Sequence, residues 1–437
     1  MLIALGLMMI ATFTFLIMTN RMSTITALTL VPVFFALLGG FGLQVPEMML
    51  NGMKKVAPAA AFLLFALLFF ATMIDAGLFD PLIKKILKWV KCDPVKIAVG
   101  TSVLTLSVAL DGDGVTTFLI VTTAMLPLYR QARMHPATLA TIATISFSVM
   151  SGMTPWGGPA ARAMSVLNVS QAEYFGPFLP TMILACAWVI LVAYILGRLE
   201  RRGILKGGVV GNSEFANAAV FEDDPERIAL QRPRLYWINM ALTIATMGTL
   251  IADVMPSASL FLLAFVIALM INYPTIAEQK KRLQAHSGSA LLIVAVVLVG
   301  GSFTGILSET HMVDALAAQL VSMVPTSWSG LVPAIIALVS IPFSFVMSND
   351  AYFFGVVPVL AKAAEAYNVT PVEVIRAAVL AQPVHFILPL VPSTIVLLGA
   401  TQLDLKTHIR CATPWSVLTC LVFIVLAIVT GSLSFNL

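Results

Sequence analysis

The chain has 437 residues, of which 59% are hydrophobic and only 11% are charged, and its mean hydropathy is +0.97. Because roughly a quarter of the residues of a soluble domain are charged, this composition excludes an ordinary soluble protein and predicts an all-α chain that crosses a membrane several times. The net charge is only +4, and the basic residues lie in short loops beside apolar runs. This pattern indicates orientation in a membrane rather than nucleic-acid binding.

Apolar segments long enough to cross a bilayer, which takes about 20 residues, occur along the whole chain. They lie at residues 2–19, 23–43, 56–79, 177–197, 236–253, 256–273, 287–308 and 413–433. The first segment has no basic residues before it and no small-residue cleavage site near its end, so we expect a span rather than a signal peptide.

Further apolar regions are interrupted by polar or helix-breaking residues. The breaks are Asp-Gly-Asp-Gly at 111–114, Thr-Pro-Trp-Gly-Gly-Pro at 154–159, Ser-Asn-Asp at 348–350 and Pro-Leu-Val-Pro-Ser-Thr at 389–394. Hydrocarbon cannot satisfy the backbone groups that such breaks free, so they survive only where protein or a water-filled cavity supplies partners. A polar cavity within the membrane is therefore predicted.

The polar stretch 199–235 divides the chain into two similar parts, 1–198 and 236–437. Asp113 and Asp350 are 237 residues apart, as are Pro155 and Pro392. This offset predicts a tandem repeat. Each unit would contain three spans, an amphipathic interfacial helix, a re-entrant hairpin, a broken helix and a final span.

Basic residues predict how the two units are oriented. The amphipathic segment 81–91 carries Lys84, Lys85, Lys88 and Lys91, whereas its counterpart 312–324 has neither Lys nor Arg. By the positive-inside rule, the first segment lies at the cytoplasmic interface and the second outside. An odd number of crossings in each unit would then make the repeats inverted, with the hairpin and broken helix of the first on the cytoplasmic side, those of the second on the outward side, and a cytoplasmic linker.

The first hairpin tip carries two acids, Asp111 and Asp113, with Thr116 and Thr117 just beyond them. Asp-Gly pairs are ordinary turn formers at a surface, but an ionisable group in an apolar region is costly unless it is used. The spacing is similar to a calcium loop, yet Thr122 stands where an EF-hand needs Glu. Hard oxygen ligands for Mg²⁺ or Ca²⁺ stay possible here.

The second tip and the second break offer matching polar groups. Ser348, Asn349 and Asp350 form the tip, which could alternatively be a turn with a helix cap. Ser393 and Thr394 could hold a carboxylate or water through their hydroxyls, or could bond only the local backbone. With half-helix N-termini and freed carbonyls nearby, this is the binding geometry of secondary transporters, and it suits an anion accompanied by a cation.

Arg162 lies two turns past the break at 154–159, the first broken helix, where Gly157 and Gly158 could merely kink a helix. Its guanidinium is always charged and needs a partner, and its planar fork suits a carboxylate. The alternative is a salt-bridged or snorkelling arginine near the outer interface. His385 is a candidate proton carrier, because its ordinary pKa lies near physiological pH, although a hydrogen-bonded core histidine is the common alternative.

Several strings together resemble a known family. They are Leu-Asp-Gly-Asp-Gly-Val-Thr-Thr at 110–117, Pro-Trp-Gly-Gly-Pro-Ala-Ala-Arg at 155–162, Ser-Asn-Asp-Ala-Tyr-Phe-Phe-Gly at 348–355, Pro-Leu-Val-Pro-Ser-Thr at 389–394 and Ile-Asp-Ala-Gly-Leu-Phe-Asp-Pro-Leu-Ile at 74–83. The chain resembles the bacterial CitMHS family of citrate–metal:proton symporters, within the ion transporter superfamily, over nearly its full length.

This resemblance implies a multi-pass transporter of the bacterial inner membrane, not an enzyme, that works as a homodimer with an elevator mechanism. It implies proton-driven uptake of citrate complexed with Mg²⁺ or Ca²⁺, with no permanently bound cofactor. The candidates for metal and proton handling are Asp111, Asp113, Asn349 and Asp350, whereas Arg162, Ser393, Thr394, Gly157 and Gly158 would meet citrate carboxylates.

Other functions stay possible from the sequence. The chain could take up di- or tricarboxylates without metal, or exchange cations for protons, but a cation:proton antiporter would leave Arg162 unused. An intramembrane aspartyl protease needs two acids on neighbouring intact helices. Here the acids lie at breaks, which argues against that enzyme.

Overall fold

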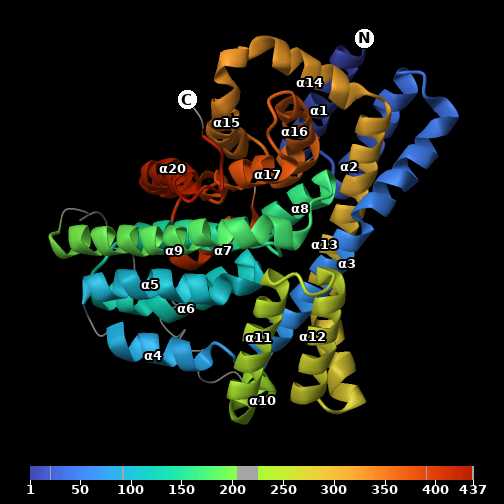
Figure 1. Cartoon of the computed structure of the whole chain (residues 1–437). Coiled ribbons are helices and arrows are strands. Elements are labelled where there is room, and N and C mark those ends of the chain that lie inside the picture. The colour runs from blue at the N-terminus through green and yellow to red at the C-terminus, as the bar shows by residue number, and fades with distance from the viewer. Residues whose placement is uncertain (20, 91–92, 204–224, 390, 436–437) are drawn as a thin grey trace.

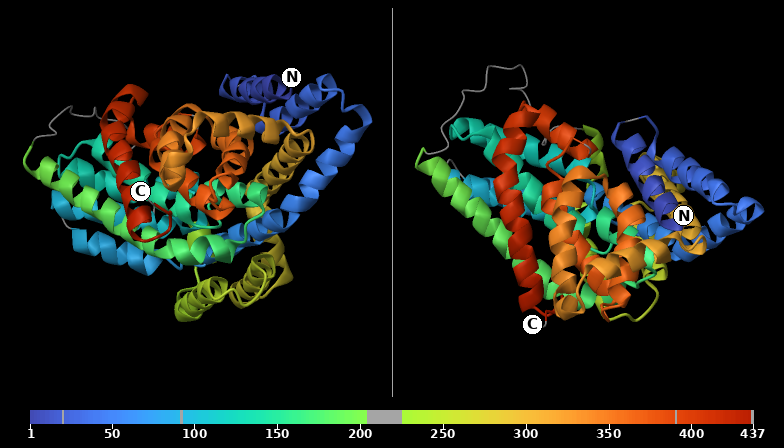
Figure 2. Two further views of the ribbon diagram at one scale, coloured as in Figure 1. Left: turned by 45° about the horizontal axis from the view of Figure 1, so that its top comes forward. Right: turned by 90° about the horizontal axis from the view of Figure 1, so that it is seen from above.

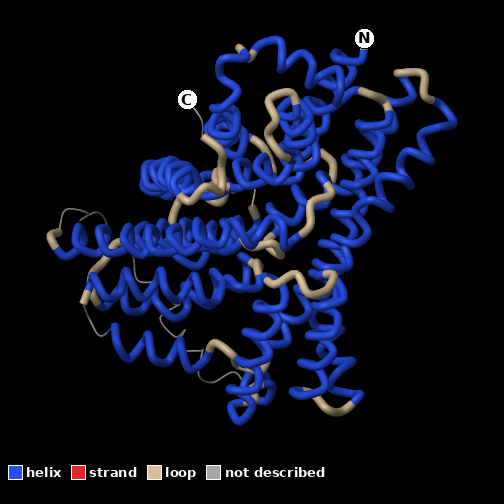
Figure 3. The backbone as a smooth tube through the Cα atoms, viewed as in Figure 1, coloured by secondary structure: helices blue, strands red, loops and turns tan. Residues whose placement is uncertain are grey.

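The computed structural model describes residues 1–19, 21–90, 93–203, 225–389 and 391–435. Within these ranges every regular element is a helix and no strand occurs (Figure 3), which confirms the predicted all-α class. Of the predicted linker 199–235, residues 204–224 lie outside the described ranges. Its described end contains the short helices α10 (Pro225–Leu230) and η4 (Pro233–Leu235).

The first half of the chain begins with helices that precede the interrupted regions. These are α1 (Leu2–Met18), α2 (Thr24–Leu38), η1 (Gly42–Gln44), α3 (Val45–Asp75) and the short α4 (Asp80–Val90). Two interrupted pairs follow, α5 (Pro94–Val108) with η2 (Ala109–Asp111) and α6 (Gly114–Gln131), then α7 (Pro136–Met153) with α8 (Gly158–Leu167). The half ends in α9 (Gln171–Arg201).

The second half has the same order of long, short and interrupted helices. It contains α11 (Tyr236–Ile251), α12 (Ser257–Asn272), α13 (Ile276–Glu309) and the short α14 (Met312–Met323). The first interrupted region contains η5 (Thr326–Leu331), α15 (Val332–Val346), the π-helical turn η6 (Ala351–Val356) and α16 (Val357–Glu365). The second contains α17 (Pro371–Val379), α18 (Gln382–His385) and α19 (Pro392–Thr401), and α20 (Leu405–Val429) ends the order.

Several helices are longer than the predicted apolar segments. Six helical stretches of the described chain have the length and hydropathy to cross a membrane, among them Ile276–Glu309, for which the sequence predicted only 287–308. Hydropathy detects the apolar part of a helix but not a polar extension. The extension of α13 begins at a capping box in which the Thr275 hydroxyl accepts the Glu278 N–H and the Glu278 carboxylate accepts the Thr275 N–H.

Helix α7 forms the centre of the part that carries the breaks. All of its residues are buried, and it packs against α5, α6, α9 and α20 (Figures 1 and 2). A helix covered on all sides shows no apolar stripe. Several of its hydroxyls bond locally or to neighbours, as where Ser146 and Ser102 bond at 2.9 Å and Ser148 donates to the Ile145 carbonyl. This packing fixes the end of α7, where the break at 154–159 begins.

Helices α3 and α13, which hold the same place in the two halves, pack side by side in opposite directions (Figure 1). The beginning of α3 meets the end of α13, because a Cβ on Gly52 would lie 2.0 Å from the Gly301 carbonyl oxygen and 2.9 Å from the Gly305 Cα. At the other end, Asp75 accepts a hydrogen bond of 3.2 Å from Arg282. Glycine therefore sets the close approach of these helices.

We expect Gly52→Ala to lower the free energy of unfolding by about 1–3 kcal/mol, because the added methyl must push the α13 backbone away. Gly288→Ala on α13 is the matched control, since a Cβ there meets nothing within 4 Å. Thermal unfolding of the detergent-solubilised variants measures both. Equal melting temperatures would show that this crossing tolerates a side chain.

Candidate functional site

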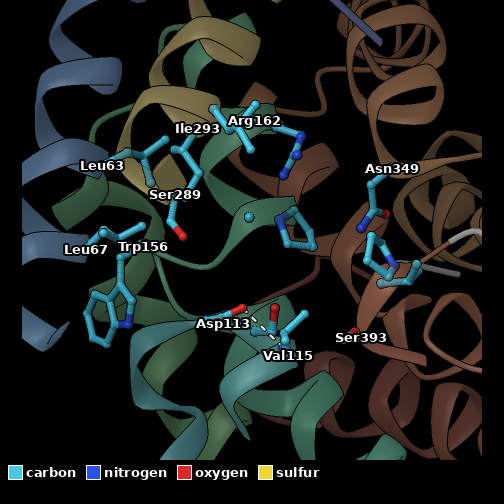
Figure 4. A pocket seen from close by; sticks show the side chains of 18 of the residues that line it. Leu63, Leu67, Asp113, Val115, Trp156, Arg162, Ser289, Ile293, Asn349 and Ser393 are labelled. Carbon is cyan, nitrogen blue, oxygen red and sulfur yellow. Dashed lines mark hydrogen bonds between the residues drawn. The ribbon is translucent and has the colours of Figure 1, made fainter. Parts of the chain in front are cut away.

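The four breaks meet at one cavity of about 390 Å³. Figure 4 shows Asp113, Trp156, Arg162, Asn349 and Ser393 arranged around it. The long helices supply the remaining wall, with Leu63 and Leu67 from α3 and Ser289, Leu292, Ile293 and Val297 from α13. A volume of roughly 300–1,000 Å³ is usual for small-molecule sites, so a compact carboxylate fits here.

The starts of three helices point at this cavity. Gly114, Gly158 and Pro392 are the first residues of α6, α8 and α19, and all three line it. The unbonded N–H groups and the dipole at a helix start favour an anion. The starts of α6 and α19 lie so close that a Cβ on Gly114 would be 2.6 Å from the Ser393 Cβ. The site therefore has built-in positive potential from the backbone.

Asp113 lines the cavity and caps α6. Its carboxylate accepts the N–H groups of Val115 and Thr116, both at 3.2 Å, and the Thr116 hydroxyl also donates to it. This is the N-cap arrangement that the Asp-Gly sequence favours. Thr117, also a predicted site residue, is buried, and its hydroxyl has no partner among the described residues.

The hairpin tip at 111–114 is held in place by residues of the break at 154–159. Asp111 ends the short helix η2, and its side chain lies outside the described part of the structure. The Trp156 indole donates to the Leu110 carbonyl at 2.6 Å. Gly112, between the acids, has a φ of +75°, a left-handed conformation that glycine adopts without strain. Gly157 has no room for a side chain, because a Cβ there would lie 2.1 Å from the Ser151 carbonyl oxygen.

Arg162 joins the two halves of the chain. Its Nε donates to Oδ1 of Asp350 at 2.6 Å, and both side chains are largely buried. The structure therefore supplies the partner that the sequence required for this guanidinium, and the partner is a predicted metal ligand. Arg162 lines the cavity together with Gly158, and a Cβ on Gly158 would lie 2.7 Å from the Arg162 Nη1.

The second tip is fixed on both sides of Asp350. The Asn349 amide donates to the Gln382 side-chain oxygen at 3.3 Å, and the Gln382 amide donates back to Asn349 at 3.1 Å. The Ser348 hydroxyl accepts the Ala351 N–H and so supports the start of η6. Asn349 lines the cavity, and π-helical turns of this kind are frequent at functional sites.

The second break places its predicted residues differently. Ser393 lines the cavity, and its buried hydroxyl oxygen has no partner among the described residues. The Thr394 hydroxyl donates to the Phe386 carbonyl at 2.8 Å, which is the local backbone bond considered above. His385 is buried, and its Nδ1 bonds the Ser344 carbonyl oxygen at 3.0 Å. Its proton-carrying role stays a prediction.

Among the described residues, no group of three His, Cys, Asp or Glu side chains is placed to hold a metal. The predicted metal set is not brought together there, since Asp350 pairs with Arg162 and Asp113 caps α6, while the side chain of Asp111 is not described. A metal that arrives as cargo would bring ligands from its carboxylate partner. The cavity then needs to supply only the remaining contacts.

Three residues of the site were not assigned from the sequence. Trp156 holds the first tip, Gln382 holds Asn349, and Ser289 contributes a hydroxyl from α13. Gln382 could have been found, because a polar residue in an apolar helix indicates function by the same argument as Asp. Ser289 gave no signal, because only the packing of α13 brings it to the breaks.

Apolar helices of membrane-spanning length, with helix breaks around a shared cavity that holds an acid and a base, are the arrangement of a multi-pass membrane transporter. The family model CitMHS, described as citrate transporter, matches residues 13–381. The chain belongs to the CitMHS citrate transporter family, which confirms the predicted family and the prediction that it is not an enzyme.

Two curated relatives agree with this assignment, and one solved structure has a similar fold. The chain is 48% identical to "Citrate transporter" of Bacillus subtilis, with both chains fully covered, and 45% identical to "Mg(2+)/citrate complex secondary transporter" of the same organism, also over both full lengths. The structure of the Alcanivorax borkumensis YdaH transporter has a similar fold. Its TM-score is 0.54 at 12% identity, over 90% of this chain and 89% of that chain.

Proposed function

We propose that the protein is a secondary active transporter that takes up citrate as a complex with a divalent cation, Mg²⁺ or Ca²⁺, together with protons. One observation carries this proposal. Among the described residues that line the cavity, Asp113 is the only acid and Arg162 the only base. A metal–carboxylate complex presents both signs of charge and matches both residues.

The alternative substrates match less well. A bare carboxylate would face Asp113 with like charge, and a bare cation would face Arg162 and the starts of α8 and α19. Trivalent citrate is also expensive to transfer into a low dielectric, whereas its metal complex carries about one negative charge, which protons can neutralise. The printed name of the Mg²⁺/citrate relative supports the same cargo.

The proposal includes how the chain moves its cargo. The opposite directions of α3 and α13 support two inverted repeats, 1–198 and 236–437, joined by the linker 199–235 on the cytoplasmic side of a bacterial inner membrane. The cavity lies between α3 and α13 on one side and the helix breaks on the other. That boundary supports an elevator movement of the broken helices along α3 and α13, in a homodimer.

The test is uptake of radiolabelled citrate into proteoliposomes that contain the purified protein. We expect uptake that requires Mg²⁺ or Ca²⁺ and rises several-fold when the outside is acidic, because coupled protons offset the charge of the complex. Equal uptake after chelation of all divalent cations would indicate a metal-free carboxylate transporter. No uptake with Mg²⁺, Ca²⁺ or Ni²⁺, together with proton-coupled sodium flux, would replace the proposal with an antiporter.

A further inference from the structure

The acid of the second tip faces the arginine of the cavity rather than the cavity itself. Asp350 is not among the residues that line the cavity, although its neighbour Asn349 is. Its carboxylate accepts a hydrogen bond from the Arg162 Nε. Among the described residues, Asp350 belongs to no group of three Asp, Glu, His or Cys side chains that could hold a metal. Asp350 is therefore placed to act on Arg162 and not to hold a metal.

The bond to Asp350 leaves one edge of the guanidinium open. Arg162 can bind a carboxylate through two parallel hydrogen bonds in two ways. One uses Nε and one terminal nitrogen, and the other uses the two terminal nitrogens Nη1 and Nη2. Asp350 occupies Nε, and in the described part of the chain nothing accepts a hydrogen bond from Nη1 or Nη2. Nη1 lies over Gly158, a cavity residue, so the open edge faces the cavity.

The surroundings keep Asp350 in this place. On its N-terminal side, Asn349 is held by the paired amide bonds with Gln382, and Ser348 accepts the Ala351 N–H. The corresponding acid of the first half, Asp113, is used to cap α6, whereas Asp350 makes no side-chain cap. The two acids at the same repeat position thus have different contacts, one with its own helix and one with Arg162.

We propose that Asp350 is a positioning residue for substrate recognition: it fixes the Arg162 Nε so that Nη1 and Nη2 present a two-pronged contact to one carboxylate of the cargo. This inference rests on the proposed function, because it takes the cargo to be a metal–carboxylate complex. Asp350 then sets how tightly the carboxylate binds and leaves the choice of metal unchanged.

The sign of the effect separates this role from simple electrostatics. Removing an acid beside an anion site makes the site more positive. If Asp350 acts only through its charge, or if it competes with the cargo for Arg162, we expect Asp350→Ala to have a lower KM for citrate. Positioning gives the opposite, because a guanidinium without its Nε partner loses the orientation of its fork. We expect KM for the citrate complex to rise roughly tenfold with kcat little changed.

The experiment measures uptake by Asp350→Ala and Asp350→Asn in proteoliposomes, each with Mg²⁺ and with Ca²⁺. We expect Asp350→Asn to recover much of the affinity, because its amide oxygen still accepts from Nε. The ratio of the Mg²⁺ and Ca²⁺ rates should be unchanged in both variants. Asp93→Asn is the matched control, since Asp93 pairs with Arg201 far along the chain at an exposed site that is not part of the cavity.

The outcomes are distinct. A lower or unchanged KM in Asp350→Ala, or a changed metal preference, would overturn the positioning role while leaving citrate transport in place. Absence of citrate uptake by the wild-type protein would instead overturn the proposed function. If Asp350→Ala does not fold, the test is made with Asp350→Asn, which keeps the bond to the Arg162 Nε. The positioning role then requires a KM for citrate within a few-fold of wild type and an unchanged ratio of the Mg²⁺ and Ca²⁺ uptake rates.

Discussion

Replacing Arg162 by lysine is expected to abolish most citrate transport, with KM for the citrate complex raised about a hundredfold. A lysine is a point charge without a planar fork, and its shorter reach cannot both bond Asp350 and meet a carboxylate as the Arg162 Nε and terminal nitrogens can. Uptake of radiolabelled citrate over a range of concentrations at saturating Mg²⁺ measures the change.

Arg201→Lys is the control for this variant. Arg201 also pairs with an aspartate, Asp93, but its side chain is 53% exposed and lies at the end of α9. Exposed ion pairs contribute about 0–1 kcal/mol, so this variant should transport normally. Wild-type citrate affinity in Arg162→Lys would assign Arg162 a structural role as the partner of Asp350 alone.

Asp113→Asn is expected to reduce metal-dependent uptake about a hundredfold while the amount of folded protein in the membrane changes little. Asparagine caps helices as well as aspartate does, because its one side-chain oxygen still accepts one of the two N–H groups that Asp113 binds, that of Val115 or that of Thr116. The variant therefore removes the negative charge that would face the cation of the complex and leaves the start of α6 in place.

The matched control is Asp404→Asn at the start of α20. Asp404 caps its helix in the same way, through the Thr407 N–H at 2.8 Å, but does not line the cavity. It should keep normal transport and show how much a lost N-cap charge matters by itself. Full Mg²⁺-dependent uptake by Asp113→Asn would remove Asp113 from the site.

The sequence predicted the fold as far as local chemistry determines it. Helices follow from apolar length, although α1, α2, α11 and α12, which lie at predicted spans, are shorter than the six stretches long enough to cross a membrane. Each of the four breaks falls where Gly, Pro or adjacent polar residues free the backbone, as at Gly112 and Pro392. The ends of the long helices were predicted less well. Hydropathy cannot distinguish the polar first turns of α13 from a loop. The capping box at Thr275 and Glu278 indicates a helix start only once the helix that follows it is known.

The sequence predicted a set of candidate site residues, and only part of that set lines the cavity. Asp113, Gly158, Arg162, Asn349 and Ser393 do line one cavity. The pairing of Arg162 with Asp350 could not be predicted, since charge and spacing indicate that a partner is needed but not which of several acids the packing brings near. The same limit applies to His385, whose bond to a carbonyl depends on the position of α15.

The ion pair between the halves also constrains how the molecule is made. Arg162 leaves the ribosome 188 residues before Asp350, a delay on the order of ten to forty seconds at about 5–20 residues per second. During that interval the guanidinium has no native acid and must stay near water or lipid headgroups. The ion pair that joins α8 to the second tip can therefore form only after the second tip has been translated.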